Sequence, residues 1–190
     1  MLYLMRHGRT DWNERRKLQG STDIPLNETG RRMAAEAAVQ YAGVSIDVCY
    51  CSPLLRARKT AELVLKDRCI PILPDVRLRE MGFGSYEGVE NSFQIPDCPV
   101  NVLFFHPEQY LPVEGGESLE ELFARTGEFL REVVIPQLAE GKNILIVGHG
   151  VMNAALICQG KGLTMEHLWD AGVEQCKLMP LELKKLGEKN

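Results

Sequence analysis

Histidine is scarce in this chain, with four among 190 residues, and paired cysteines and long apolar runs are missing. A metal centre built on histidine would therefore have few candidate ligands. The six cysteines form no Cys-x-x-Cys pair, and a chain of this length can be stable without disulfide bridges. No apolar run approaches the roughly 18 to 20 residues of a membrane span, and no charged-then-apolar leader precedes the first predicted strand. We therefore expect a cytoplasmic protein with no membrane association.

An excess of charge of one sign is missing as well. The net charge is −4, and the contents of 45% hydrophobic and 25% charged residues are typical of a globular protein. The overall field gives no reason to expect nucleic acid or an anionic membrane as a partner. Any anion site must therefore be a local concentration of arginine. The length suits one domain over residues 1–190.

Short apolar runs alternate with helical patterns along the chain. Predicted strands cover 2–5, 47–51, 70–73, 143–147 and an edge at 176–183, and predicted helices cover 29–40, 53–66, 119–133 and 164–170. Ser52 is the expected N-cap of the second helix with Pro53 as its first residue, and Ser118 forms a capping box with Glu121. This alternation predicts an α/β fold with a mostly parallel central sheet and helices on both faces.

Residues 89–113 break the alternation and are predicted to form a small inserted lid. The segment holds four prolines and several aromatic residues, namely Phe93, Phe104, Phe105 and Tyr110. Two interpretations stay open for these aromatics. They stack, together with His106, on the ring or sugar of a substrate, or they form the small core of the lid.

Two histidines and an arginine are predicted to meet at one edge of the sheet. His7 follows the first strand, His149 follows the strand 143–147, and Arg56 lies at the start of a helix that also follows a strand. Ligands of open α/β sheets bind beyond the carboxyl ends of the strands, where loops and helix N-termini converge. If the two strands are neighbours, both imidazole rings lie in the same crevice.

These residue types suit the transfer of a phosphoryl group. Arg6, Arg56 and His149 can donate hydrogen bonds to phosphoryl oxygens while His7 attacks phosphorus in line. Flanking cations disfavour a second positive charge and so lower the pKa of His7, which keeps the ring neutral. Glu80 precedes a glycine-rich loop and can protonate the leaving oxygen, then activate water. The sequence thus predicts hydrolysis of a phosphomonoester through a phosphohistidine.

A longer series of motifs runs in order from residue 2 to about 155, with only the predicted lid unmatched: Arg6-His7-Gly8 with Thr10 and Asn13, Gln19-Gly20, Asp23-Ile24-Pro25-Leu26, Thr29-Gly30, Ser52-Pro53-Leu54, Arg56-Ala57, Thr60-Ala61-Glu62, Leu78-Arg79-Glu80, Gly84, Glu87-Gly88, Gly115-Gly116-Glu117-Ser118 and Gly148-His149-Gly150. In this series the chain resembles the histidine phosphatase superfamily, also called the phosphoglycerate mutase-like family. The resemblance implies a three-layer α/β/α sandwich.

The resemblance also implies roles for individual residues. His7 is the phosphorylated nucleophile, Glu80 the proton donor, and Arg6, Arg56 and His149 the phosphate pocket, with no metal or other cofactor required. It implies that Asn13 lines the phosphate site, and the matched Gln19, Gly20 and Gly150 complete the set of expected phosphate-binding residues.

The loop that follows Glu80 is similar to that of the phosphatase branch, because the mutases carry a longer insertion there. We therefore expect a phosphatase for a small phosphorylated metabolite, with phosphoglycerate mutase as the alternative. Two departures stand out. Arg9 occupies a position where relatives often have Glu or Gln, and it either borders the site or is a solvated loop charge. The segment after His149 lacks the arginine that many relatives place near position 154.

Other classes of function remain open at this level. His7, His149 and Glu80 could ligate a non-haem metal as a facial triad, although the flanking arginines would repel a divalent ion. The chain could also bind a phosphorylated ligand without catalysis on the same fold. The sequence does not determine the oligomeric state. A homodimer is one state that stays open.

Overall fold

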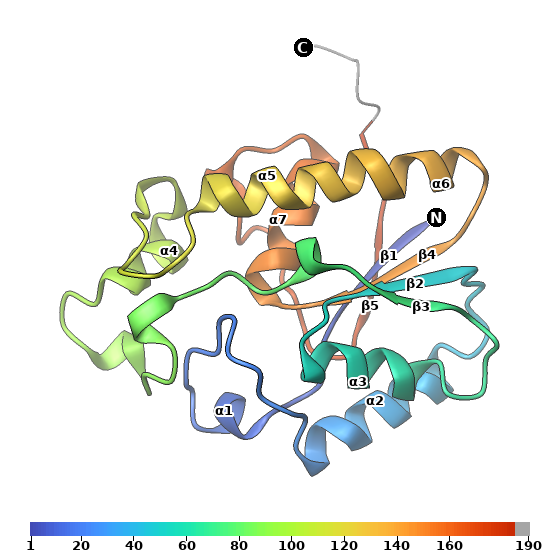
Figure 1. Ribbon diagram of the computed structural model, residues 1–190, viewed down its shortest axis with the longest axis horizontal. Coiled ribbons are helices and arrows are strands. Elements are labelled where there is room, and N and C mark those ends of the chain that lie inside the picture. Colours follow the sequence, from blue (N-terminus) through green and yellow to red (C-terminus); the bar gives the residue numbers. More distant parts are fainter. Residues whose placement is uncertain (185–190) are drawn as a thin grey trace.

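A five-stranded sheet forms the centre of the computed structural model, which describes residues 1–184 (Figure 1). The strand order is β3-β2-β4-β1-β5. Its strands are β1 (Leu2–Arg6), β2 (Val48–Cys51), β3 (Ile72–Pro74), β4 (Ile144–Gly148) and β5 (Leu178–Leu181). The first four run parallel, and β5 pairs with β1 in the antiparallel sense. The predicted mostly parallel sheet is confirmed.

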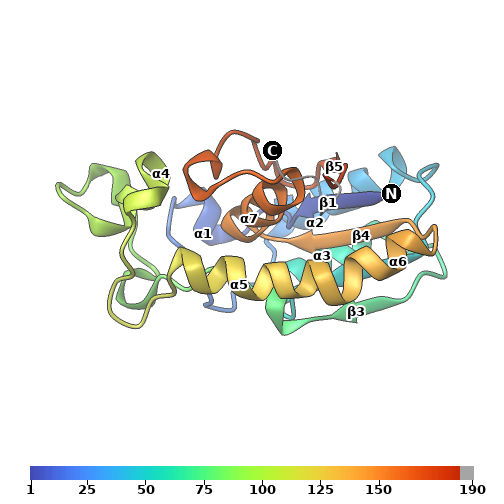
Figure 2. The same ribbon diagram turned by 90° about the horizontal axis from the view of Figure 1, so that it is seen from above.

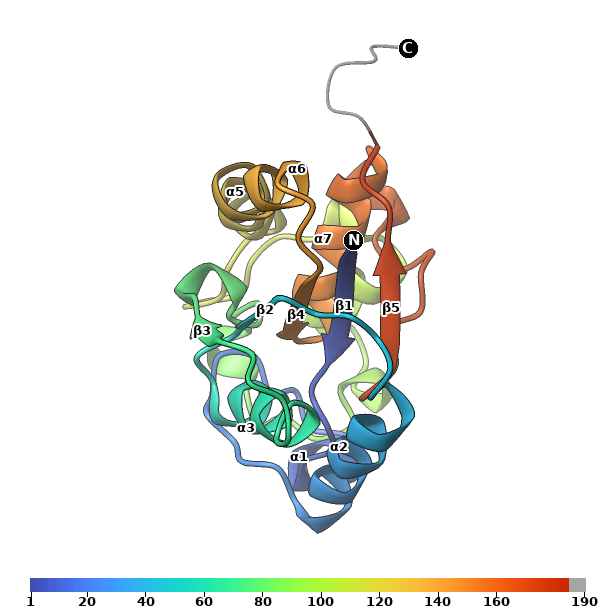
Figure 3. The same ribbon diagram turned by 90° about the vertical axis from the view of Figure 1, so that its right-hand side faces the viewer.

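Helices cover both faces of this sheet, as Figure 3 shows. Helices α2 (Glu28–Gln40) and α3 (Leu55–Val64) pack on one face. The other face carries α5 (Leu119–Phe129) and α7 (Gly150–Lys161), with a π-helical stretch (Leu130–Val134) joining α5 to α6 (Ile135–Ala139). Short helices α1 (Asp11–Glu14) and α4 (Val102–Phe105) lie in loops. The fold is the predicted α/β sandwich.

Strand β4 shows why the sheet needs both helical layers. Ile144 and Ile146 point into the cluster under α5 and α7, whereas Leu145 and Val147 point into the cluster under α2 and α3. All four are fully buried. Each buried aliphatic side chain contributes roughly 1.5 to 3 kcal/mol, so a continuous apolar strand requires cover on both faces.

Helix α3 begins differently from the prediction. Its first residue is Leu55 and its N-cap is Leu54, so neither Ser52 nor Pro53 has the expected position. The Leu55 N–H instead donates to Asp23 Oδ1 at 2.7 Å, while Ser52 Oγ accepts from the Leu54 N–H at 3.3 Å. Because Asp23 lies 32 positions away, the local sequence carried no sign of this cap. The capping box of Ser118 at the start of α5 is present as predicted.

The loop after β1 lies directly against α2, and glycine makes this approach possible. A Cβ at Gly30 would overlap the backbone of Arg9, with Arg9 N at 2.6 Å. A Cβ at Gly8 would lie 2.5 Å from the Gly30 carbonyl oxygen. The two bare backbones therefore allow the chain that follows His7 to lie against α2.

Residues 89–113 lie at one end of the molecule, as Figure 2 shows for α4 and its neighbours. The segment consists of α4 and short 3₁₀ turns at Ser92–Gln94, Pro99–Asn101 and Pro107–Gln109. Phe104 stacks on Trp169 with ring centroids 5.4 Å apart, and the Trp169 indole N–H donates to the Leu103 carbonyl at 2.8 Å. The segment is thereby tied to residues 165–169.

The remaining predicted elements are shorter than expected. The expected helix at 164–170 is a 3₁₀ turn over Met165–His167, and the expected edge strand at 176–183 reduces to β5, with Pro180 on the outer edge of the sheet. Among residues 1–184, no helix combines the length and the apolar character needed to cross a bilayer.

Candidate active site

Parallel pairing of β1 with β4 brings the two histidines together. Arg6 lies beside Gly148 in the register of the two strands, so the next residues, His7 and His149, leave the sheet at the same edge. Their ring centroids are 5.2 Å apart, and both rings are buried.

Hydrogen bonds determine which tautomer each neutral histidine ring adopts. His7 Nδ1 lies 2.7 Å from the Gly8 carbonyl oxygen, which only accepts, so Nδ1 carries the hydrogen and Nε2 keeps its lone pair. His149 Nδ1 accepts from Arg56 Nε at 3.2 Å, so Nε2 carries the hydrogen. This buried Nε2–H has no hydrogen-bond partner among the described residues. One ring therefore offers a nucleophile and the other a donor.

Burial is the main reason why both rings are neutral. It lowers the pKa of His7 well below the ordinary value, and the charges of Arg56 and then Arg6 lower it further. The pKa of His149 is also lowered well below its ordinary value, first by burial and then by Arg56. The sequence predicted the effect of the cations, but the larger cause is the removal of the rings from water.

Arg56 is fully buried and is held by three acceptors. Besides the bond to His149, its Nη1 donates to the Thr22 carbonyl and its Nη2 to the Gly20 carbonyl, each at 2.7 Å. Burial lowers the pKa of Arg56 to about 10, so the guanidinium is charged at neutral pH. Arg6 donates from Nη1 to the Val173 carbonyl at 3.3 Å, and within residues 1–184 its buried Nε has no hydrogen-bond partner.

Glu80 lies at the N-terminus of α7. Its Oε2 accepts from the N–H groups of Gly150 at 2.9 Å and Val151 at 3.2 Å, and its Oε1 accepts from Met152 at 3.1 Å and Met81 at 2.9 Å. Four backbone donors therefore hold one carboxyl group. The bond to Gly150 spans 70 positions, and nothing in the local sequence indicated it.

A cavity of about 170 Å³ contains eight of the nine predicted site residues: Arg6, His7, Asn13, Gln19, Gly20, Arg56, Glu80 and Gly150. His149 does not line it and instead contacts His7 and Arg56. Asn13 Oδ1 accepts from the Gln175 amide at 3.0 Å, and Gln19 Oε1 accepts from Thr10 Oγ1 at 3.1 Å. A Cβ at Gly150 would lie 3.6 Å from Arg6 Cζ and 3.7 Å from Glu80 Oε2.

Further residues, outside the nine predicted ones, line the same cavity. Lys17, Leu18, Phe83, Val151 and Trp169 line it together with Phe104 of the segment 89–113. Of the other aromatic residues in the segment 89–113, Tyr110 is buried. Phe93 packs against both Phe104 and Phe105. Trp169 could not be predicted from the sequence, because it follows a turn far along the chain and no motif surrounds it.

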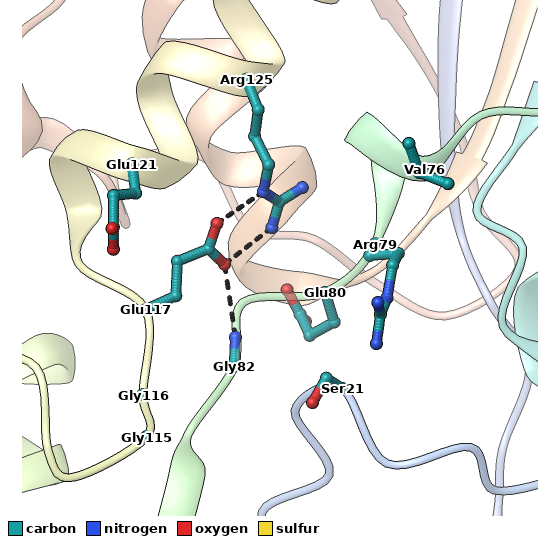
Figure 4. A pocket seen from close by; sticks show the side chains of 10 residues that line it. All are labelled: Ser21, Val76, Arg79, Glu80, Gly82, Gly115, Gly116, Glu117, Glu121 and Arg125. Carbon is teal, nitrogen blue, oxygen red and sulfur yellow. Dashed lines mark hydrogen bonds and ion pairs between the residues drawn. The ribbon is translucent and has the colours of Figure 1, made fainter.

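A second cavity, of about 540 Å³, adjoins Glu80 and is drawn in Figure 4. In its wall, Glu117 accepts from Arg125 Nε at 2.6 Å and Nη2 at 2.8 Å, and from the Gly82 N–H at 3.3 Å. Arg79 points into the cavity from the opposite side (Figure 4). Glu117 thus anchors the loop that follows Glu80.

The two departures noted in the sequence lie away from the cavity around His7. Arg9 is exposed and lines a separate cavity of about 680 Å³, although Arg6 and Asn13 border both. Ala154 is fully buried in the core. Within residues 1–184, no three side chains of His, Cys, Asp or Glu are arranged to hold a metal ion.

Comparison with known proteins agrees with the resemblance. Residues 2–189 match the family described as the histidine phosphatase superfamily, branch 1. The uncharacterised phosphatase PhoE of Bacillus subtilis is 37% identical over 159 residues, which cover 84% of this chain and 76% of PhoE. A 2,3-bisphosphoglycerate-dependent phosphoglycerate mutase of Methylobacterium is 30% identical, with 95% of this chain and 89% of the mutase covered. The structure of Bacillus stearothermophilus YhfR is similar with a TM-score of 0.81 and 35% identity, over 93% of this chain and 88% of that one.

Proposed function

Because the chain belongs to branch 1 of the histidine phosphatase superfamily, we propose that His7 is the nucleophile that takes the phosphoryl group from a small phosphomonoester. The bond between His7 Nε2 and phosphorus forms while the bond to the leaving oxygen breaks. Water then attacks the phosphohistidine and releases inorganic phosphate. The bond from Nδ1 to the Gly8 carbonyl supports this assignment because it leaves the Nε2 lone pair free.

Charge on the phosphoryl oxygens is balanced by three donors. We assign this role to Arg6, Arg56 and the Nε2–H of His149. The orphaned Arg6 Nε and His149 Nε2 support the assignment, because a buried donor without a partner is costly unless a ligand satisfies it. Asn13, Gln19, Gly20 and Gly150 complete the proposed phosphate site.

Glu80 is our candidate for the general acid and base. It gives a proton to the leaving oxygen in the first step and takes one from water in the second. Because both of its oxygens accept backbone N–H groups, the carboxyl group must give up part of this cradle to reach the leaving oxygen. The proposed acid is therefore also a structural cap of α7.

The composition of the cavity favours hydrolysis over mutase chemistry. A mutase must hold the second phosphate of a bisphosphorylated ligand. Beyond Arg6 and Arg56, the only other cation lining the cavity within residues 1–184 is Lys17. The stacked pair of Phe104 and Trp169 offers an aromatic face to the leaving group. We propose a small metabolite with an apolar or ring-shaped leaving group, covered by the segment 89–113 as a lid.

The observation that carries this proposal is the buried pair of His7 and His149 beside Arg56. The test is a phosphatase screen against a panel of metabolites, with a 3-phosphoglycerate mutase assay beside it. We expect phosphate release and an acid-labile phosphohistidine, both abolished in His7→Ala and kept in the half-exposed control His167→Ala. Turnover in folded His7→Ala comparable to wild type would refute the nucleophile assignment.

Two other outcomes of the screen point to the alternatives. Phosphate transfer between the positions of phosphoglycerate with little hydrolysis would identify a mutase. Failure on the whole panel, with no phosphohistidine trapped, would identify a protein that binds a phosphorylated ligand without catalysis.

We also propose a cytoplasmic location. All six cysteines are free, and five of them are buried, which suits a reducing compartment. Cell fractionation tests this proposal. The homodimer stays a prediction that light scattering during gel filtration checks.

A further inference from the structure

Glu87 lies behind the phosphate site and has no role in the chemistry proposed so far. Its carboxylate accepts hydrogen bonds from Ser21 N at 2.7 Å, Ser21 Oγ at 2.9 Å, Thr22 N at 2.9 Å and Phe83 N at 3.1 Å, and from the hydroxyl of Thr22. Burial raises the pKa of Glu87, but the bonds from Thr22 and Ser21 outweigh it, and the net pKa is lowered. The carboxylate therefore fixes the turn 20–22.

Gly20 shows how closely this turn fits Glu87. Its φ of +52° lies in the left-handed region, and a Cβ there would overlap the Glu87 carboxyl group, with Cδ at 2.6 Å. Only a bare backbone allows both the conformation and the contact.

The opposite side of the same turn holds Arg56. The carbonyl oxygens of Gly20 and Thr22 accept hydrogen bonds from the two terminal nitrogens of its guanidinium, each at 2.7 Å. Arg56 Nε in turn donates to His149 Nδ1, which sets the ring so that Nε2 is the donor. A continuous series of hydrogen bonds thus links Glu87 to the turn, to Arg56 and to His149.

We propose that Glu87 is a positioning residue that holds Arg56 in the geometry for binding the phosphoryl group. This inference rests on the proposed role of Arg56 as a phosphate ligand. A carboxylate in direct contact with Arg56 would compete with the anionic substrate for the guanidinium. Neutral carbonyls orient the guanidinium without such competition. The charged carboxylate of Glu87 binds the other side of the turn and so fixes these carbonyls.

The first test is Glu87→Gln. An amide has one acceptor oxygen, so its NH₂ group must face either the N–H of Thr22 or those of Ser21 and Phe83, and the turn must shift. A displacement of about 1 Å at such a site can cost about a hundredfold in rate. We expect kcat/KM to fall about 10- to 100-fold, mainly through kcat, because the contact of Arg56 strengthens in the transition state.

Glu117→Gln is the matched control. Glu117 also holds the loop 82–83, through the Gly82 N–H, but none of its hydrogen bonds leads to Arg56. We expect a comparable loss of thermal stability and a loss of kcat/KM at least about threefold smaller than for Glu87→Gln. Equal losses of activity in the two variants would overturn the proposal.

A double-mutant cycle separates positioning from general support of the fold. In an Arg56→Lys background, Glu87→Gln should lower kcat/KM by less than about threefold, because lysine cannot use the carbonyls of the turn in the same way. Full additivity would show that Glu87 acts independently of Arg56. If Arg56→Lys alone leaves kcat/KM unchanged, the proposed role of Arg56 as a phosphate ligand fails. If Arg56→Lys lowers kcat/KM but the two substitutions are fully additive, only the proposed role of Glu87 fails.

Binding of orthovanadate, measured by calorimetry, gives a readout without turnover. Glu87→Gln should weaken vanadate more than inorganic phosphate, because vanadate adopts the geometry of the transition state. Equal weakening of both anions would count against the proposal. If Glu87→Gln does not fold, Thr22→Val removes one hydroxyl donor at nearly constant shape. A smaller effect in the same direction, absent in the Arg56→Lys background, is then expected, and no effect in either background would refute the link.

Discussion

The position of Glu80 predicts that its replacement destabilises the protein as well as slowing the reaction. In Glu80→Gln, one carboxyl oxygen becomes an NH₂ group. Either Gly150 and Val151 or Met152 and Met81 then present their N–H groups to a donor, since each oxygen serves two of them. A buried polar group left without its partner costs about 1 to 3 kcal/mol.

Two such groups, with partial relaxation of α7, give a loss of about 2 to 4 kcal/mol in the free energy of unfolding. For a domain of this size the melting temperature changes by roughly 2 to 4 °C per kcal/mol, so a decrease of roughly 5 to 15 °C is expected. Calorimetry and urea titration measure these quantities. The control is Ser118→Ala, which removes the partly exposed N-cap of α5 and should cost about 1 kcal/mol.

The activity of Glu80→Gln should depend on the leaving group. A poor leaving group such as an alkoxide needs the proton, so its rate should fall about 10²- to 10⁴-fold, whereas nitrophenolate leaves without protonation and should be affected far less. Wild-type stability together with an equal loss on both kinds of substrate would refute the reasoning, because neither the cap nor the proton donor would then exist.

Two further predictions concern stability. The pKa values of His7 and His149 are lowered in the folded protein, while the unfolded value is near 6.5, so the unfolded chain takes up protons first and the free energy of unfolding should decrease as the pH falls from about 6.5 to 5. Urea titrations across this range test it, and constant stability would contradict it. Gly30→Ala should destabilise the protein by about 1 to 3 kcal/mol because its Cβ overlaps the Arg9 backbone, although alanine usually favours a helix. Gly43→Ala, whose Cβ would have no other atom of the described residues 1–184 within 4 Å, is the control and should melt within a degree or two of wild type.

The sequence predicted the parts of the fold that depend on local patterns. The strands at 47–51 and 143–147 and the capping box at Ser118 are signalled by neighbouring residues, and the structure has them within a residue or so of the expected bounds. The start of α3 was wrong because the actual partner, Asp23, belongs to another loop. A local capping preference does not determine the first residue of a helix when a carboxylate from a distant loop accepts a hydrogen bond from the first turn.

For the site, the sequence by itself determined the chemical groups and their places at strand ends: His7 after β1, His149 after β4, and Arg56 at the start of α3. Motif and periodicity carry this information because the residues of one strand or helix are contiguous.

Only the tertiary structure decided how these groups are held. The bond from Arg56 that sets the tautomer of His149, three of the four N–H groups on Glu80, the turn between Glu87 and Arg56, and the aromatic pair of Phe104 and Trp169 all join residues from separate elements. Such contacts depend on the packing of the whole chain, which has no periodic trace in the sequence. Burial decided the charge as well, because it is the desolvation of His7 and His149 more than the neighbouring arginines that keeps the rings neutral.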